Sequence, residues 1–353
     1  MPFSHLSVSL PYWQNRDPLD ALAVAESADR LGYHRLWVGE MATFDAFSVA
    51  TAIGRDSGRI PLCLGPLAVD VRTPANIAMG AASVAALTGR RVDVALGTSS
   101  TVVVRDWHGR RRLRTARHLE ETTHIVRALL AGDKVEYEGQ LERVRGFRLR
   151  LPALRMPDQT GAGGEIVVAA FGDRALEVAA RCADRVVLNL VTPAQVARCV
   201  SAIAEFARAA DRPAPPVSVW VTAAADPTPD LYATVRQAVV GYLRAPGYDA
   251  MFTEAGFGET VALAHSGAHP REILAAIPDE LPATVGMFGD AATLAARLSN
   301  YRDAGANEIV LVPATSAEDP AGEHTLSTIA ELAIRRRTQS HVGGPASDGE
   351  GRG

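Results

Sequence analysis

The sequence contains few cysteines and almost no lysine. Its three cysteines, Cys63, Cys182 and Cys199, show no metal-ligand spacing, and their odd number argues against a disulfide framework. We therefore expect reduced, buried thiols, no metal site and a cytoplasmic location. Lys134 is the only lysine, so arginine supplies nearly all of the positive charge.

Charge and hydropathy argue against two classes of partner. The formal net charge of -4 gives no electrostatic reason to bind nucleic acid or an anionic membrane surface. The longest apolar runs are as long as a β-strand and fall short of the ~20 residues that a membrane span requires. The N-terminus also lacks the basic and apolar segments of a signal peptide. We expect a soluble protein whose partner is a small-molecule substrate.

Eight short apolar runs alternate with helical patterns along the chain. Most are apolar throughout, as expected of parallel strands that are covered on both faces. This alternation predicts an α/β fold, a (β/α)8 TIM barrel. A doubly wound sheet is the competing arrangement, but the turn after the first run lacks a phosphate-binding glycine cluster. The runs lie at 5–10, 35–40, 60–69, 92–97, 166–171, 185–190, 217–223 and 308–314.

We expect one domain over residues 1–337 with insertions after strands 4 and 7. The first insertion, at 98–164, should contain a helix at about 115–131 and a pair of short segments, "VEYEG" and "FRLRL". The second, at 225–307, should contain several helices. Residues 338–353 are rich in glycine and serine, which predicts a disordered tail.

Polar and glycine-containing segments follow several of the predicted strands. In a TIM barrel, active sites lie at the C-terminal ends of the strands. Glu40 ends the second strand, where it either faces the barrel mouth or pairs with an arginine at the rim. Three hydroxyl side chains follow the fourth strand: Thr98, Ser99 and Ser100.

The fifth strand runs into a glycine turn and a helix, through Phe171, Gly172, Asp173 and Arg174. Free backbone N–H groups at such a helix start, together with Arg174, could hold a phosphate. An ordinary capped turn explains the same residues.

His108 is the histidine that we single out, because it lies in a loop beside Trp107 and amid five arginines. A histidine of ordinary pKa can donate or accept a proton at neutral pH. The alternative is a surface histidine without a role. The arginines either form a solvated face or receive an anionic ligand.

Three segments, "AESADRLGYHRLWVGE", "RTPANIAMGAASVAALTGRRVDVALGTSS" and "VAAFGDRALEVAARCADRVVLNL", carry a family resemblance. In this order they resemble the bacterial luciferase-like monooxygenase superfamily, over most of residues 5–315. The wording "GE…FDAF", "GP…RTP" and "TSS…WHGR" is most similar to the branch that uses the deazaflavin coenzyme F420. Enzymes that use FMN share the fold and much of the pattern.

The resemblance implies roles for particular residues. Glu40 matches an acid against the cofactor ring, and Asp70 matches a polar position near it. The bond between Leu67 and Ala68 matches a non-prolyl cis peptide behind the ring. Thr98, Ser99 and Ser100 match the loop that lines the cofactor cleft, and the segment 171–174 matches the loop that holds the cofactor phosphate.

The chain departs from the family pattern at two positions. Many relatives carry a histidine where this chain has Met41, and sugar-phosphate dehydrogenases of the family carry a glutamate where it has Ser100. Both changes argue against glucose-6-phosphate dehydrogenase chemistry. His108 is our candidate for the missing proton donor.

The resemblance implies an oxidoreductase that transfers a hydride between coenzyme F420 and a small organic substrate. Two alternatives stay open: an FMN-dependent monooxygenase that uses reduced flavin and dioxygen, and a flavin-binding protein without catalysis. Dimers are common in this superfamily, so we expect a homodimer.

Overall fold

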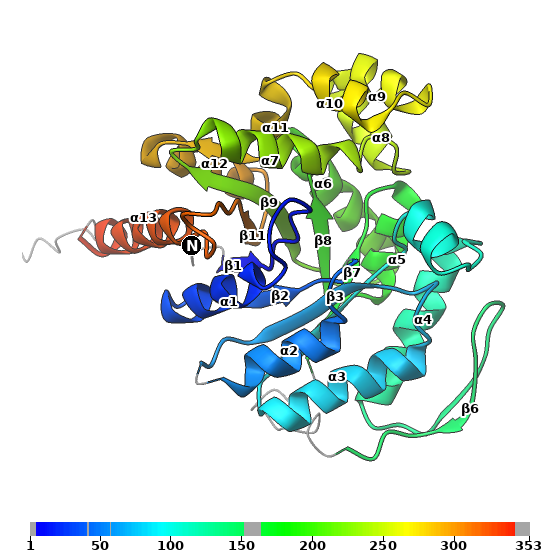
Figure 1. The fold of residues 1–353 in the computed structure, drawn as a ribbon. Coiled ribbons are helices and arrows are strands. Elements are labelled where there is room, and N and C mark those ends of the chain that lie inside the picture. The colour runs from blue at the N-terminus through cyan, green and yellow to red at the C-terminus, as the bar shows by residue number, and fades with distance from the viewer. Residues whose placement is uncertain (1–4, 41, 57, 152–163, 343–353) are drawn as a thin grey trace, which may run out of the picture.

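Eight parallel strands form a closed barrel in the order β1-β2-β3-β4-β7-β8-β9-β11, and β11 pairs with β1 to close it (Figure 1). The computed structural model describes residues 5–40, 42–56, 58–151 and 164–342. The barrel confirms the fold predicted from the sequence, and all eight apolar runs form its strands. Their bounds are β1 (His5–Ser9), β2 (Leu36–Val38), β3 (Leu62–Ala68), β4 (Val92–Gly97), β7 (Ile166–Ala169), β8 (Arg185–Asn189), β9 (Val217–Ala225) and β11 (Glu308–Pro313).

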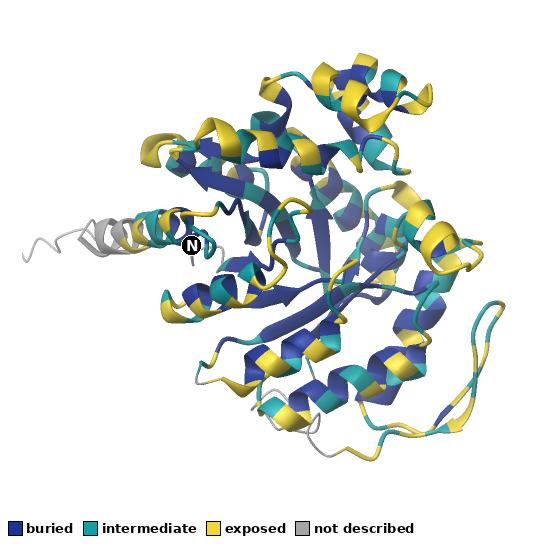
Figure 2. Cartoon of the chain, viewed as in Figure 1, coloured by how far each residue is buried: buried dark blue, intermediate teal, exposed yellow. Residues whose placement is uncertain are grey.

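Helices surround the barrel and cover the strands, which are almost entirely buried (Figure 2). The helices between and after the strands are α1 (Asp20–Arg30), α2 (Ala46–Arg55), α3 (Pro74–Thr88), α4 (Thr115–Leu130), α5 (Asp173–Cys182), α6 (Pro193–Ala209), α12 (Ala291–Asp303) and α13 (Glu323–Val342). Among the described residues, no helix is both long and apolar enough to cross a bilayer. Helix α13 includes residues 338–342 of the predicted tail, and the rest of that tail lies outside the described residues.

Two insertions interrupt the minimal barrel after β4 and after β9, its fourth and seventh strands. The first contains a π-helix, η1 (Val102–Trp107), helix α4 and a hairpin of β5 (Val135–Glu138) and β6 (Arg143–Phe147). The second contains α7 (Pro229–Val240), α8 (Tyr248–Phe252), η3 (Thr253–Phe257), α9 (Gly258–His265), α10 (Pro270–Ala276), α11 (Glu280–Val285) and β10 (Met287–Gly289). The helices α7 to α11 lie together at the top of Figure 1 and share a separate hydrophobic cluster.

Two predicted segments differ from the observed strands. The second hairpin strand lies at 143–147 and not at 147–151, because a short turn places Arg143 directly opposite Glu138. Strand β2 ends at Val38, so Glu40 lies two residues beyond the strand and is not its last residue.

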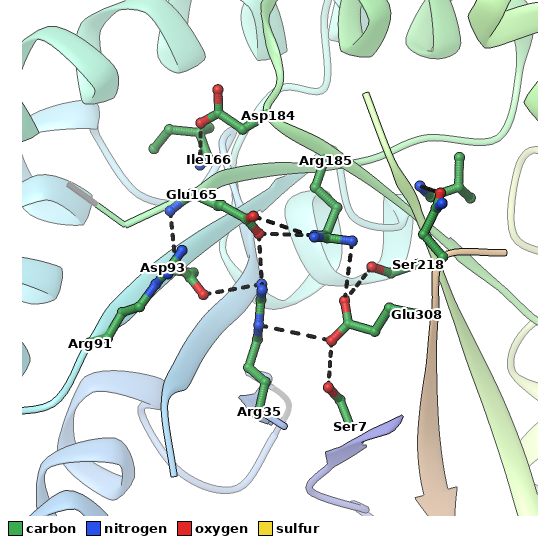
Figure 3. A network of polar contacts seen from close by, with 12 residues as sticks. Ser7, Arg35, Arg91, Asp93, Glu165, Ile166, Asp184, Arg185, Ser218 and Glu308 are labelled. Atoms are coloured by element: carbon green, nitrogen blue, oxygen red, sulfur yellow. Dashed lines mark hydrogen bonds and ion pairs between the residues drawn. The ribbon is translucent and has the colours of Figure 1, made fainter. Parts of the chain in front are cut away.

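A buried ionic network lies at the N-terminal ends of the barrel strands (Figure 3). Arg35 donates to Glu165 at 3.0 Å and forms ion pairs with Asp93 at 3.1 Å and with Glu308 at 3.9 Å. Arg185 donates to Glu165 at 2.9 Å and lies 3.7 Å from Glu308. Breaking one partner of such a buried network is costly, because it leaves uncompensated charge. This end of a barrel serves stability, and the opposite end is therefore where a site is expected.

Candidate active site

The tips of β3, β4 and β7 lie in close contact at the mouth of the barrel. A side chain at Gly97 would meet Pro66 at 3.2 Å and Ala169 at 3.5 Å, so glycine there allows the close approach. A side chain at Gly39, after β2, would lie 3.5 Å from the ring of Tyr12 and 3.7 Å from that of Trp220. Glycine at these two positions therefore allows the strand tips and the two rings to pack closely together.

Strand β3 bulges between Leu64 and Leu67. Gly65 has a φ of +115°, and a Cβ there would lie 2.3 Å from the carbonyl oxygen of Ala95. The cis peptide in this strand is Gly65–Pro66, so the prediction of a cis bond between Leu67 and Ala68 is wrong. The physical reason is that the irregular segment contains a proline, whose peptide bond has a far weaker trans preference than any other. Leu67 and Ala68 are already back in register with β4.

Glu40 is held by an arginine. Arg72 donates from Nε to Glu40 Oε2 at 2.9 Å, and its Nη2 contacts both Glu40 Oε1 and Asp45 Oδ2. The guanidinium group also lies over the ring of Phe47, 4.8 Å from its centroid. Sequence analysis offered two alternatives for Glu40, a position facing the barrel mouth or an ion pair with an arginine at the rim. Both are correct, since Glu40 follows a strand tip at the mouth and is paired with Arg72 there.

Tyr12 lies beside this pair. Its hydroxyl donates to the carbonyl oxygen of Gly39 at 2.9 Å. Burial, and after it the negative charge of Glu40, raise the pKa of Tyr12 above its ordinary value. The phenol therefore stays protonated at neutral pH and can act as a hydrogen-bond donor.

Asp70 follows β3 and forms a cluster that the sequence did not reveal. His118, in the first turn of α4, lies with Nδ1 2.9 Å from Asp70 Oδ1 and with Nε2 2.7 Å from Glu142 Oε1. A neutral imidazole has one N–H and can donate to one carboxylate only, so contact with both favours the imidazolium. Burial alone would lower the pKa of His118, but the hydrogen bonds to Asp70 and Glu142 outweigh it and raise the pKa to about 9. The second oxygen of Asp70, Oδ2, is buried and has no hydrogen-bond partner in the described part of the chain.

The turn between β5 and β6 docks onto α4 beside this cluster. The carboxylate of Glu121 accepts hydrogen bonds from the backbone N–H groups of Gln140, Leu141 and Glu142, each at 2.9 Å. Burial opposes ionisation, but these bonds and the one from Arg117 lower the pKa of Glu121 to about 2. The turn that carries Glu142 to His118 is thus fixed by a second carboxylate.

The three hydroxyl residues after β4 have separate roles. Thr98 Oγ1 accepts from Arg112 Nη2 at 3.2 Å, and Ser100 Oγ accepts from the backbone N–H of Val103 at the start of η1. Ser99 is exposed and takes the left-handed conformation, with a φ of 53°. The backbone N–H of Val69 donates to the carbonyl oxygen of Gly97 at 3.0 Å, which places Asp70 and Thr98 on adjacent tips.

The turn after β7 presents an open helix start. Gly172 precedes α5 without a side-chain cap, and a Cβ added to it would meet nothing within 4 Å. Gly172, Asp173 and Arg174 are exposed. The ring of Phe171 packs 4.7 Å from that of Tyr248, in the second insertion, whose hydroxyl accepts from Asn189 at the end of β8.

His108 follows η1 and is exposed. Among the described residues, its ring has no hydrogen-bond or ion-pair partner. The structure therefore places His118, and not His108, in contact with the strand tips. One feature of the sequence could have indicated His118. It lies in the first turn of the helix that follows the loop after β4, and the start of such a helix lies at the barrel mouth. Met41 lies outside the described residues.

Comparison with known proteins identifies relatives of this chain. A Mycobacterium tuberculosis protein whose name describes a coenzyme F420-dependent oxidoreductase is 28% identical over 36% of this chain and 36% of its own length. The chain aligns with less than half of the length of the first curated relatives that it matches, between 36% and 45%.

The solved structures that match nearly the whole chain include two of known cofactor class. The coenzyme F420-dependent tetrahydromethanopterin reductase from Methanopyrus kandleri has a TM-score of 0.78 at 18% identity, covering 94% of this chain and 99% of that one. The oxygenating constituent of 3,6-diketocamphane monooxygenase of Pseudomonas putida, in complex with FMN, has a TM-score of 0.69 at 17% identity, covering 94% and 98%. At these identities the structures show the shared fold.

The sequence profile of one family, described as luciferase-like monooxygenase, matches residues 4–308. This range includes every barrel strand up to the first residue of β11 and all of the strand tips described above. The chain therefore belongs to the luciferase-like monooxygenase family.

Proposed function

We propose that the protein is an oxidoreductase that transfers a hydride between coenzyme F420 and a small organic substrate. The observation that carries the proposal is the open start of α5, at Gly172, on the same barrel mouth as the bulged β3 and the paired Glu40. Three exposed residues with free backbone N–H groups suit a phosphate. The bulge is the element on which a ring would rest.

The coenzyme would supply the redox chemistry when bound. Phe171, Gly172, Asp173 and Arg174 would hold its phosphate, while Leu67 and Ala68 would support its ring. Thr98, Ser99 and Ser100 would line the cleft at the tip of β4.

Two acids would act near the ring. Arg72 fixes the carboxylate of Glu40, and His118 fixes that of Asp70, so both are oriented before a ligand arrives. The phenol of Tyr12 stays protonated beside Glu40, where it can donate a hydrogen bond. We keep His108 as a candidate proton donor from the loop after β4, tested by His108→Ala with turnover and coenzyme affinity measured separately.

An FMN-dependent monooxygenase is the second candidate, because a structure bound to FMN shares this fold. The phosphate turn serves either cofactor. The two cofactors differ in the chemistry that follows. Reduced FMN reacts readily with dioxygen, whereas a reduced deazaflavin, which has carbon in place of N5, reacts with it poorly.

Equilibrium titration of the coenzyme-free protein with F420 and with FMN, followed by fluorescence, tests the proposal. We expect tight binding of F420 and weak binding of FMN. Tight FMN binding alone would refute the choice of cofactor, and binding without turnover across a broad substrate panel would favour a non-catalytic protein.

A matched pair of variants locates the phosphate. Arg174→Gln should weaken coenzyme binding ~10-fold through loss of one charge-assisted hydrogen bond. Arg208→Gln, an exposed arginine in the last turn of α6, should leave it unchanged. Equal affinity of both variants would contradict the assignment of the phosphate to the α5 turn. Light scattering on the same samples tests the expected homodimer.

A further inference from the structure

The loop between β4 and α4 carries an unbalanced positive charge. It contains Arg105, Arg110, Arg111, Arg112 and Arg114, and a single acid, Asp106. Asp106 is paired with Arg105 at 2.7 Å, and Arg114 donates to the side chain of Gln140. Four of the five arginines, namely Arg114 and the three at 110 to 112, therefore have no ion pair with any described carboxylate.

Arg112 differs from its two neighbours because it is half-buried and turns back toward the barrel. Its Nη2 donates to Thr98 Oγ1 at 3.2 Å, next to the last residue of β4. Its Nε is buried and has no hydrogen-bond partner in the described part of the chain. A buried donor of a charged group without an acceptor is costly, so the arrangement favours an acceptor that the described residues do not supply.

Four acids on the side of β2 and β3 are already bound to other cations. Glu40 and Asp45 share Arg72, and Asp70 and Glu142 share His118. Thr98 accepts from Arg112, which leaves its own hydroxyl hydrogen free to donate. A guanidinium N–H and a hydroxyl thus lie together at the tip of β4, and both can donate to one oxyanion.

We propose that Arg112 and Thr98 form a subsite for an oxyanion, a carboxylate or a phosphate group, of a ligand bound at the barrel mouth. This deepens the proposed function and rests on it for the identity of the ligand, which is either the substrate or the coenzyme. If the group belongs to the substrate, the enzyme acts on an anionic organic molecule. The subsite is separate in sequence and in its strand from the turn at 172–174.

Binding of inorganic phosphate to the coenzyme-free protein, measured calorimetrically at constant ionic strength, tests the subsite without any assumption about the coenzyme. Arg112→Gln should weaken the phosphate affinity ~10- to 100-fold, as expected for a charged hydrogen bond. Arg111→Gln removes the same charge from the neighbouring, exposed position and should change the affinity less than twofold. Circular dichroism and melting without phosphate verify that both variants are folded.

Equal phosphate affinity of Arg112→Gln and Arg111→Gln would overturn the proposal, since the effect would then be one of net charge. Thr98→Val should produce a smaller loss, about threefold to tenfold. An unchanged phosphate affinity in Thr98→Val would show that the Thr98 hydroxyl does not bind the oxyanion. It would refute the proposal that Arg112 and Thr98 both donate to it.

Titration with F420 in the presence and absence of phosphate then distinguishes the two sources. If Arg112→Gln weakens F420 binding and phosphate competes with F420 at the Arg112-dependent site, the oxyanion belongs to the coenzyme. If both bind together and F420 affinity is unchanged in the variant, it belongs to the substrate. Should neither F420 nor FMN bind, the proposed cofactor is wrong, while the phosphate result still decides the subsite.

Discussion

Removal of the imidazole of His118 should uncouple the tip of β3 from the β5–β6 turn. In the structure one ring nitrogen contacts Asp70 at 2.9 Å and the other contacts Glu142 at 2.7 Å. The side chain of His118 is 14% exposed and that of Asp70 is 2% exposed, so the contacts are largely shielded from water. His118→Gln keeps a polar side chain but removes the positive charge that both carboxylates share.

The expected magnitude follows from the pKa. A rise from 6.5 in the unfolded chain to about 9 in the folded protein corresponds to at most ~3.4 kcal/mol. Part of the cluster reaches solvent, which screens it, so we expect about 2 kcal/mol. The folded protein holds this proton more tightly than the unfolded chain does. The stabilisation is therefore complete below pH ~6.5 and is lost as the pH rises from there through about 9.

Urea unfolding of the wild type and of His118→Gln between pH 6 and pH 9.5 measures this effect. We expect a difference of about 2 kcal/mol at pH 6 that shrinks toward pH 9.5. His124→Gln, an exposed histidine on the same helix, serves as the control and should show no difference. A constant difference across this range, or an NMR titration that places the pKa of His118 near 6.5, would refute the reasoning.

Three further changes test other parts of the structure. Arg35→Met should lower the free energy of unfolding by about 3–5 kcal/mol in urea, because it leaves buried acids unpaired; a loss below ~1 kcal/mol would contradict the network. Glu40→Gln should reduce kcat/KM at least ~10-fold, while Asp45→Asn, which removes the charge of the other carboxylate bound to Arg72, should not. Equal losses in the two variants would show that the effect comes from the loss of an ion pair with Arg72 and not from a role of Glu40 in the reaction. Glu121→Ala should cost about 2–4 kcal/mol and increase hydrogen exchange at the backbone amides of 140–142, and unchanged exchange there would show that the turn is held otherwise.

The barrel could be predicted because each of its strands corresponds to a short, continuous pattern in the sequence. Each buried parallel strand needs an apolar run, and each run is followed by a helical pattern, so the count and order of strands follow from the chain alone. The exact ends of the strands could not be predicted from the sequence. Strand β2 stops at Val38 since pairing with β3 ends at Leu64, where the bulge begins, and a bulge depends on the neighbouring strand.

The contacts across the barrel could not be predicted, because they join residues far apart in sequence. Ser7 donates to Glu308 across 301 positions, and Arg35 reaches Glu165 across 130. In the sequence the three charged residues, Arg35, Glu165 and Glu308, lie at the start of apolar runs, a position typical of a solvent-exposed boundary. Closure of the barrel places them together in the interior.

The candidate site was predicted only in part, because some of its residues directly follow predicted strands while their partners lie far away in the sequence. Glu40, Asp70 and Thr98 follow predicted strands, and the structure places all three at the mouth. Their partners Arg72, His118 and Arg112 were not assigned roles. His118 had no sequence neighbour that identified it, since its contacts come from residues 48 and 24 positions away.

The pairing of charges at the mouth also constrains how a ligand is oriented. On the side of β2 and β3, Arg72 and His118 each hold two carboxylates, so four negative charges share two positive ones. On the side of β4, Arg112 has no carboxylate partner among the described residues. An anionic group that approaches the mouth is repelled by the first side and attracted by the second. If the oxyanion at Arg112 belongs to the substrate, we therefore expect the anionic end of the substrate over Thr98, at the tip of β4, and its neutral end toward Glu40, while the coenzyme phosphate lies at the α5 turn.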